Sequence, residues 1–347
     1  MVSPDVLRHV VDVHCHPTDS PVASEIMEAL SITICAMGTR QEDQALVRDL
    51  ATSYPEKVVP CFGYHPWFSH RITLKPNVPK EDHYRSLFSP SNDEENQILE
   101  DLLNVLPEPL TLEEVVSDVR RNLEAFPDAM LGEVGLDRSY RVAYDYFASP
   151  RKLTPFTIPV DHQLVILHAQ INVAIELGRN ISLHSVKSQQ ATMDLLSQLR
   201  IRHGAKFDRI SLDMHSCGFS PTMWKDIQRK YSNVFLSLST TINGRSPNHR
   251  VLIDACTPDR ILVESDFHDV SECTERTWDI VKTIAEVKGW HIETEWAEEG
   301  DGVQPGVVHT LERNWRSFKA GNHSPAISRK KIKKAQDWVS DESSEEK

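Results

Sequence analysis

Residues 11–16 read Val-Asp-Val-His-Cys-His, a short apolar run that ends in two histidines separated by one residue. A run of this kind, rich in β-branched residues, is typical of a buried strand. Side chains at positions i and i+2 of an extended strand point to the same side. His14 and His16 are therefore expected to offer two imidazoles to one metal ion at the end of this strand.

Seven further runs of this kind follow, with amphipathic stretches such as 112–125, 162–177 and 189–202 between them. Strands that alternate with helices predict βα units and a parallel sheet. Eight units favour an α/β fold of the TIM (β/α)₈ type, and the chain has no Gly-x-Gly-x-x-Gly turn that would favour an open doubly wound sheet. The eight expected strands are 10–14, 32–37, 58–64, 129–134, 181–184, 210–214, 234–238 and 261–264.

Two stretches interrupt this alternation and are expected to be insertions after the third and fourth strands. Residues 70–109 are polar, acidic and proline-containing, a composition expected to leave them exposed, dispensable for folding and without a core. Residues 139–159 are rich in aromatic residues and are expected to cover the mouth of the barrel. One barrel domain is thus expected over 1–321, with its insertion at about 70–110, followed by a charged, disordered tail over 322–347.

The chain has 347 residues, of which 38 are Lys or Arg and 51 are Asp or Glu, so its formal net charge is −13. This acidity argues against a protein that coats nucleic acid, but it allows a nuclease that grips its substrate locally. The six cysteines form no Cys-x-x-Cys pair, and no secretory signal or membrane-spanning apolar run is evident. We expect a protein without a membrane segment, located in the cytoplasm or the nucleus.

Side chains that bind metals fall at the ends of five of the expected strands, where the carboxyl ends of a barrel meet at one mouth. Imidazoles and carboxylates suit Zn²⁺ or Mn²⁺, and Mg²⁺ is a further candidate. Six ligands are too many for one catalytic ion with an open position, but they suit two divalent ions about 4 Å apart that share a carboxylate. Glu133 is the natural bridge, because its strand is central. The expected ligands are His14, His16, Glu133, His184, His215 and Asp266.

Other polar residues near the expected mouth are weaker candidates. His65, in Gly-Tyr-His-Pro-Trp, is expected to orient a phosphate oxygen or to donate a proton; otherwise it is a loop histidine beside a tryptophan. Glu264 precedes Asp266 by two residues and is expected to orient a ligand histidine. Arg138 is a candidate for substrate contact, and Asp137 is expected to be structural.

Six ordered blocks resemble the TatD family of metal-dependent deoxyribonucleases. The resemblance runs from about Val11 to Phe318 and implies a barrel of the amidohydrolase superfamily, two divalent ions and hydrolysis of phosphodiester bonds in DNA. It also implies that His14, His16, Glu133 and Asp266 hold one ion, and that Glu133, His184 and His215 hold the other. The blocks are VDVHCHPTD (11–19), CFGYHPW (61–67), LGEVGLD (131–137), ISLHSV (181–186), MHSCGFS (214–220) and LVESDF (262–267).

The chain departs from the family pattern after the fifth strand. The family's arginine two residues beyond the strand-end histidine is Val186 here, and Lys187 comes next. Lys187 is expected to contact phosphate in its place, as a point charge rather than a bidentate fork. The long insertion after the third strand resembles the fungal or eukaryotic branch of TatD-like proteins.

These patterns together predict a hydrolase acting on ester bonds, a deoxyribonuclease of the exonuclease type. Asp266 would accept the proton of the attacking water, while His65 and Lys187 would position the phosphate. One alternative is another hydrolase of the same superfamily, although a bridging lysine would be expected where Glu133 stands. A second alternative is a barrel that acts through protein contacts made by the insertion or tail. The choice between DNA, RNA and a small nucleotide ester, and the oligomeric state, stay open.

Overall fold

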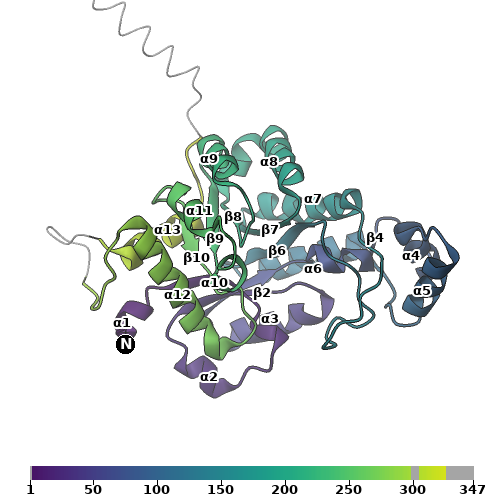
Figure 1. Cartoon of the computed structure of the whole chain (residues 1–347), viewed down its shortest axis with the longest axis horizontal. Coiled ribbons are helices and arrows are strands. Elements are labelled where there is room, and N and C mark those ends of the chain that lie inside the picture. Colours follow the sequence, from purple (N-terminus) through teal and green to yellow (C-terminus); the bar gives the residue numbers. More distant parts are fainter. Residues whose placement is uncertain (1, 298–304, 326–347) are drawn as a thin grey trace, which may run out of the picture.

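Eight parallel strands form one sheet whose spatial order follows the chain (Figure 1). The computed structural model describes residues 2–297 and 305–325. Each expected strand is present with small shifts at its ends, and the predicted α/β barrel with insertions is confirmed. The strands are β1 (Val11–Cys15), β2 (Thr33–Met37), β3 (Val58–Phe62), β6 (Met130–Asp137), β7 (Ile181–Val186), β8 (Leu212–Met214), β9 (Val234–Leu238) and β10 (Ile261–Val263).

Helices connect successive strands and cover the outside of the sheet, as in other α/β barrels (Figure 1). The helix over Leu112–Ala125 shows how the sequence specifies these helices. Thr111 and Glu114 form a capping box at its start, and Val115, Val119 and Leu123 are buried on one face. The main helices are α3 (Gln41–Ser53), α6 (Leu112–Ala125), α7 (Val160–Leu177), α8 (Gln189–His203), α9 (Pro221–Lys230), α11 (His249–Ala255), α12 (Val270–Lys288) and α13 (Val307–Ala320). Shorter ones are α1 (Pro4–Leu7), α2 (Ser24–Ala29) and α10 (Thr240–Asn243).

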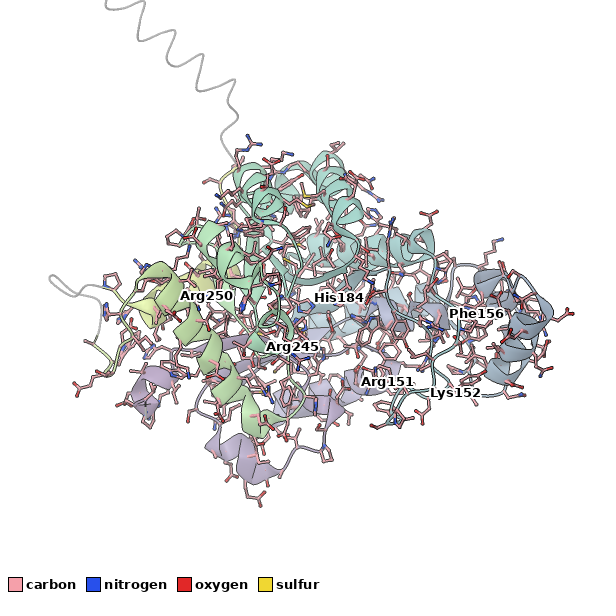
Figure 2. The ribbon with its side chains drawn as sticks, viewed as in Figure 1. Arg151, Lys152, Phe156, His184, Arg245 and Arg250 are labelled. Atoms are coloured by element: carbon pink, nitrogen blue, oxygen red, sulfur yellow. The ribbon has the colours of Figure 1, made fainter. Side chains whose placement is uncertain are left out.

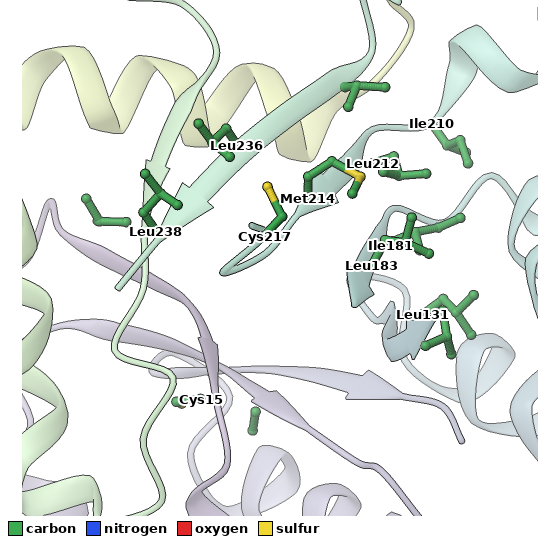
Figure 3. Packing of buried hydrophobic residues seen from close by; sticks show 14 of the residues in the cluster. Cys15, Leu131, Ile181, Leu183, Ile210, Leu212, Met214, Cys217, Leu236 and Leu238 are labelled. Atoms are coloured by element: carbon green, nitrogen blue, oxygen red, sulfur yellow. The ribbon is translucent and has the colours of Figure 1, made fainter. Parts of the chain in front are cut away.

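Two apolar clusters form the core of the barrel domain. The larger lies between strands and helices, and Figure 3 shows part of it, including Leu131 of β6, Leu183 of β7 and Leu236 of β9. The smaller gathers side chains from six strands at one place, as only the interior of a barrel can, together with Phe318 of α13. These apolar residues fill the interior of the barrel, and polar side chains lie at the carboxyl ends of its strands.

The first and last strands meet through single hydrogen bonds rather than a regular ladder. The Asp266 amide donates to the His14 carbonyl (3.0 Å), and the His16 amide donates to the Phe267 carbonyl (2.8 Å). The buried carboxyl of Asp12 accepts from the Ser265 amide (2.9 Å) and the Ser265 hydroxyl (2.6 Å). Asp12 therefore fastens the seam of the barrel directly beneath the end that carries the histidines.

The insertion after β3 is a helical hairpin, α4 (Lys80–Phe88) and α5 (Asp93–Leu103), which extends from one end of the molecule (Figure 1). Short strands β4 (Ile72–Thr73) and β5 (Leu110–Thr111) pair at its base. The expectation that this segment lacks a core is wrong, because its few apolar residues fall at helical spacing among the charges. They pack against the second insertion, in a cluster of Tyr84, Phe88, Leu99, Leu102, Leu103, Leu106, Val142, Phe156 and Ile158.

Three histidines lie where this hairpin meets the barrel, and one of them, His83 of α4, bonds directly across the junction. The His70, His83 and His162 rings each donate to a backbone carbonyl of the short helix Pro66–Arg71, at 2.8–2.9 Å. Burial, with Arg71 close by, lowers the pKa of His70 to about 3, and burial lowers the pKa of His83 and of His162 as well. All three rings are therefore neutral where the hairpin is docked.

The predicted C-terminal tail falls partly outside the described residues, which end at 325. The first residues of that segment bond to the barrel: the Asn322 and His323 amides donate to the Arg209 and Asp208 carbonyls. The His323 ring lies 2.7 Å from the Ser211 hydroxyl. Among the helices described, none has the length and apolar character needed to cross a membrane.

Asp12→Ala should lower the free energy of unfolding by about 2–4 kcal/mol, because two buried donors of Ser265 lose their acceptor. Asp12→Asn is the matched control, since its amide still accepts from the Ser265 amide and can donate to the hydroxyl. Urea unfolding of both variants measures the difference. Equal losses would show that the charge of Asp12, rather than its hydrogen bonds, holds the seam.

Acid should destabilise the protein through the histidine junction. The pKa of His70 is about 3 when folded and 6.5 in its ordinary state, so between these values the unfolded chain binds a proton that the folded chain does not. The free energy of unfolding should fall by about 1.4 kcal/mol per pH unit for this group well below pH 6.5. His70→Asn, which keeps a donor but cannot titrate, should show a shallower fall in urea titrations from pH 7 to 4.5; parallel curves would contradict this role of His70.

Candidate metal centre

The polar side chains expected at the strand ends converge on one cavity of about 320 Å³ at the mouth of the barrel. Its lining includes His16, His65, Glu133, His184, His215 and Asp266. His14 lies completely buried directly behind them. Figure 2 shows His184 near the centre of the molecule, and Phe156 beside the hairpin. The structure thus brings together all six predicted ligands and His65.

Glu133 of β6 lies at the centre of this group. Its Oε2 is 3.4 Å from His16 Nε2 and 3.8 Å from His14 Nε2. Its Oε1 is 2.8 Å from His184 Nδ1 and 3.0 Å from His215 Nε2. Each oxygen of one carboxylate therefore faces a different pair of imidazoles. This division is the geometry expected of a carboxylate shared by two cations.

Asp266 completes the first of these two groups. Its Oδ1 lies 3.4 Å from His16 Nε2 and 4.0 Å from His14 Nε2. The donor atoms of His14, His16 and Asp266 all lie within 4.8 Å of one another, close enough to hold one ion. The donors of Glu133 and His215 lie equally close to that of His14, so the two groups adjoin.

Imidazole nitrogens in this cavity face each other at short distances. His14 Nε2 and His16 Nε2 are 3.3 Å apart, and His184 Nδ1 and His215 Nε2 are 3.2 Å apart. Two lone pairs cannot face each other this closely, so a proton or a cation must lie between them. A set of four imidazoles and two carboxylates fits borderline divalent cations such as Zn²⁺ or Mn²⁺.

A hydrogen bond holds the outer nitrogen of one ligand histidine, whereas the outer nitrogens of His184 and His215 only lie near carboxylates and have no hydrogen-bond partner among the described residues. His14 Nδ1 is 2.8 Å from the Ser182 hydroxyl, and His184 Nε2 is 3.5 Å from Asp137 Oδ2. His215 Nδ1 is 3.8 Å from Oε1 of the completely buried Glu264. A partner on the outer nitrogen of a ligand histidine fixes the ring and its tautomer. Glu264 lies behind His215 rather than in the cavity, but its oxygens accept from the Ser216 and Ser237 hydroxyls, and its role in orienting the ring stays a prediction.

The carboxylates of the cluster stay charged because imidazoles surround them. Burial alone would raise the pKa of Glu133, but His65 and the neighbouring rings outweigh it and lower that pKa well below its usual range. Burial is likewise outweighed at Asp266, where His16 is the main cause of a pKa of about 2. The same pairing raises the pKa of His16 to about 9 against the effect of burial. Protonated imidazoles such as His16 therefore balance these carboxylates in the absence of a metal, and a bound cation would take the place of their protons.

His65 has a different environment from the other rings. Its Nδ1 accepts a hydrogen bond from the Trp67 amide (3.1 Å), so the ring proton of the neutral form lies on Nε2. Nε2 is 3.2 Å from Glu133 Oε1 but off the direction of a hydrogen bond, and it has no other partner among the described residues. Burial lowers the pKa of His65 to about 4, against the pull of Glu133. The ring is therefore a neutral donor at the cavity wall.

Three residues at the mouth have left-handed backbone, which non-glycine residues rarely adopt. They are Lys187 (φ 50°), Ser216 (φ 38°) and Asp266 (φ 47°). Each follows the end of a strand, where this conformation turns the chain abruptly. Strain of this kind persists where surrounding contacts hold it, and it gathers at functional sites. It places Asp266 in the cluster although its strand has already ended.

An aromatic wall closes one side of the cavity. Trp67, Phe68 and Tyr146 line it, and the Trp67 indole donates to Asp137 Oδ2 (2.6 Å). Tyr140 stacks on Trp67 with ring centroids 5.1 Å apart. Tyr140 and Tyr146 belong to the second insertion, so the expected loop over the mouth supplies part of the wall. Its composition indicated an aromatic loop, but nothing in the sequence indicated which ring would reach the cavity.

Two predicted substrate contacts do not line this cavity. Arg138 is exposed, while its neighbours Asp137 and Ser139 are part of the lining. Lys187 is also exposed and borders a second, adjoining cavity. Asp19, which does line the metal cavity, was not predicted. Its position depends on a turn after β1 and on its ion pair with the buried Arg40 (2.8 Å), and neither has a local sequence signal.

Comparison with known proteins gives the family of this chain. A family model described as TatD related DNase matches residues 11–298. The Cut9-interacting protein scn1 of Schizosaccharomyces pombe is 30% identical over 324 residues, covering 83% of this chain and 95% of that protein. The uncharacterized deoxyribonuclease YMR262W of Saccharomyces cerevisiae is 26% identical over 273 residues, covering 75% and 84%.

Solved structures share the fold at low sequence identity. YJJV, a TatD homolog of Escherichia coli, has a TM-score of 0.55 at 17% identity and covers 92% of this chain and 100% of its own. An uncharacterized amidohydrolase of Saccharomyces cerevisiae has a TM-score of 0.56 at 11% identity, covering 89% and 99%. The extent of the family match, together with the scn1 identity, shows that this chain belongs to the TatD related DNase family.

Proposed function

We propose that this protein is a two-metal phosphodiesterase that hydrolyses DNA. The observation that carries the proposal is the position of Glu133, whose two oxygens face two separate groups of imidazoles. His14, His16, Asp266 and Glu133 would hold one ion, and Glu133, His184 and His215 the other. Zn²⁺, Mn²⁺ and Mg²⁺ are the candidate ions.

When bound, the two ions would supply an acidified water and neutralise charge on the phosphate. Asp266 is placed to accept the proton of that water, because it is ionised and lines the cavity. His65 would donate its Nε2 proton as a hydrogen bond to a phosphate oxygen. Since burial keeps this ring neutral near pH 7, His65 acts in this proposal as a positioning donor rather than as a cationic acid.

The aromatic wall supports a substrate with flat rings. A nucleobase can stack on Trp67 or Tyr146 while its phosphate meets the cluster. A relative is named a deoxyribonuclease, which favours DNA within this class. A cavity of about 320 Å³ is at the small end for ligand pockets, which favours attack at a chain end and thus an exonuclease.

Protein contact is a second candidate function, and it does not exclude the first. The relative with 30% identity is named for its interaction with Cut9. In this chain the hairpin offers a separate surface, on which Glu81, Asp82, Glu94, Glu100 and Asp101 are exposed. A partner with a basic face would suit this surface, and a cytoplasmic or nuclear location is proposed with it.

Glu133→Gln should do more damage than His65→Ala. The amide keeps one acceptor oxygen and no charge, so the bridge fails, bound metal drops towards one ion or none, and hydrolysis falls by several orders of magnitude. His65→Ala should keep the metal content and slow hydrolysis by roughly 10²- to 10⁴-fold. Metal analysis beside rates on single-stranded DNA and a bis-aryl phosphodiester decides this. Two ions and near-normal turnover in Glu133→Gln would refute the bridge.

Tyr146→Ala should raise KM for a dinucleotide by about tenfold, since stacking on an aromatic ring contributes about 1–3 kcal/mol per base. Tyr146→Phe keeps the ring and should behave as the parent. A dinucleotide that lacks one base is the control substrate. It should be hydrolysed equally by the parent and the Ala variant if Tyr146 acts by stacking on that base, but not if the substitution disorders the loop. If the Ala variant loses activity equally on both substrates, Tyr146 does not stack on a base.

A further inference from the structure

A second cavity of about 300 Å³ adjoins the metal cavity. The two share Ser185, Val186, Ser216 and Ile242 in their linings. Ser185 and Ser216 directly follow the cluster histidines of β7 and β8 in the chain, so the second cavity begins one residue away from the proposed metal ligands. A substrate held at the cluster can therefore extend into it.

The two cavities differ in the side chains that line them. Four carboxylates line the metal cavity, those of Asp19, Glu133, Asp137 and Asp266. None of the described residues that line the second cavity is an Asp or Glu, although the chain has 51 of these residues. Its polar groups are instead hydroxyls and amides, from Gln189, Asn243 and Ser246 among others, and the imidazole of His249, whose buried Nε2 has no hydrogen-bond partner among the described residues. A lining of this kind can donate hydrogen bonds to an anion without repelling it.

One cation lines this cavity and a second is next in the chain to a lining residue, and neither has a partner among the described residues. Lys187 lines it and is exposed, and no hydrogen bond or ion pair engages its ammonium group in the part of the chain that the structure describes. Arg245 is exposed beside the lining residue Ser246, on the loop between α10 and α11, and it too has no ion pair there. Unpaired cations beside a cavity without carboxylates favour a bound anion.

The amino end of α8 adds partial positive charge at the same place. Gln189, the first residue of this 15-residue helix, lines the cavity. The preceding Ser188 makes no capping hydrogen bond, because its hydroxyl donates to the Val186 carbonyl, and the first turn contains no acidic residue. Free amides at a helix start attract anions, and phosphate above all.

We infer that the second cavity is a binding subsite for a second phosphate group of the substrate, next to the one that is cleaved. Lys187 and the start of α8 hold this phosphate. The inference rests on the proposed phosphodiesterase function and extends it. It also changes the expected role of Lys187, which contacts the neighbouring phosphate rather than the scissile one. A substrate with two phosphates is thus preferred over one with a single phosphate.

The test compares substrates that differ by one phosphate, on the metal-loaded full chain. The substrates are a dinucleotide, the same dinucleotide with a 5′- or a 3′-terminal phosphate, and a trinucleotide. In the parent protein the extra phosphate should lower KM by about tenfold, the scale of one charge-assisted hydrogen bond at a solvated site. The terminal phosphates and the trinucleotide distinguish a phosphate monoester from an internal diester as the natural occupant.

Lys187→Met should remove most of this preference, raising KM for the substrates with two phosphates about tenfold more than for the plain dinucleotide. Lys187→Arg should restore the preference, since it keeps the charge. Lys225→Met on α9 is the matched control, because Lys225 is an exposed lysine that lines neither cavity. It should keep the full preference of the parent.

Two results would overturn the inference while leaving the proposed function intact. One is a parent that hydrolyses the dinucleotide but gains nothing from an added phosphate at either end. The other is a Lys187→Met variant that loses the same factor on every substrate, which would place Lys187 at the scissile phosphate. A metal-loaded parent that hydrolyses none of the substrates would instead refute the phosphodiesterase itself.

Discussion

The carboxylate of Glu133 is the constraint on which the site depends. It is buried, and five imidazoles lie within 4 Å of its oxygens, a density of donors and acceptors that is costly without added protons or cations. A buried charge of this kind cannot be left unpaired, so the rings around it must carry protons or share a cation with it. The Ser182 hydroxyl holds His14, and Glu264 stands behind His215. The polar network beneath the cavity follows from this single buried charge.

The barrel brings the imidazoles to this carboxylate, because the carboxyl ends of the parallel strands in a closed barrel lie together at one mouth. Closure is incomplete as a ladder and depends on Asp12 and a few hydrogen bonds around Asp266. The seam and the cluster therefore share residues: the backbone that closes the barrel also carries His14, His16 and Asp266. The same few residues therefore determine both the stability of the seam and the geometry of the cluster. A substitution that weakens the seam is expected to displace the proposed metal ligands.

Local patterns were enough to predict the strands and the six histidine and carboxylate side chains that converge at the mouth of the barrel. A strand-end histidine such as His184 can be recognised from the sequence, because a buried apolar run directly precedes it. The barrel fold then places the ends of all such runs at one mouth. The hairpin core was missed for the opposite reason. Leu99 and Leu102 are scattered among acidic residues, and they are buried in a cluster that includes Phe156 from far along the chain. Tyr146 was likewise beyond prediction, since its place depends on how a long loop folds back over the mouth.

An acidic protein that acts on a polyanion faces repulsion at long range, and this chain carries a formal net charge of −13. Screening at physiological salt limits that repulsion to about 8 Å, so contacts inside the mouth decide binding. The proposed arrangement divides this task between two adjoining cavities. One is rich in carboxylates and would hold the cations; the other has no carboxylate among its described lining and offers Lys187 and a helix start. In this arrangement the substrate phosphates are attracted only at the two positions where they bind. The rest of the surface can then be acidic without preventing substrate binding.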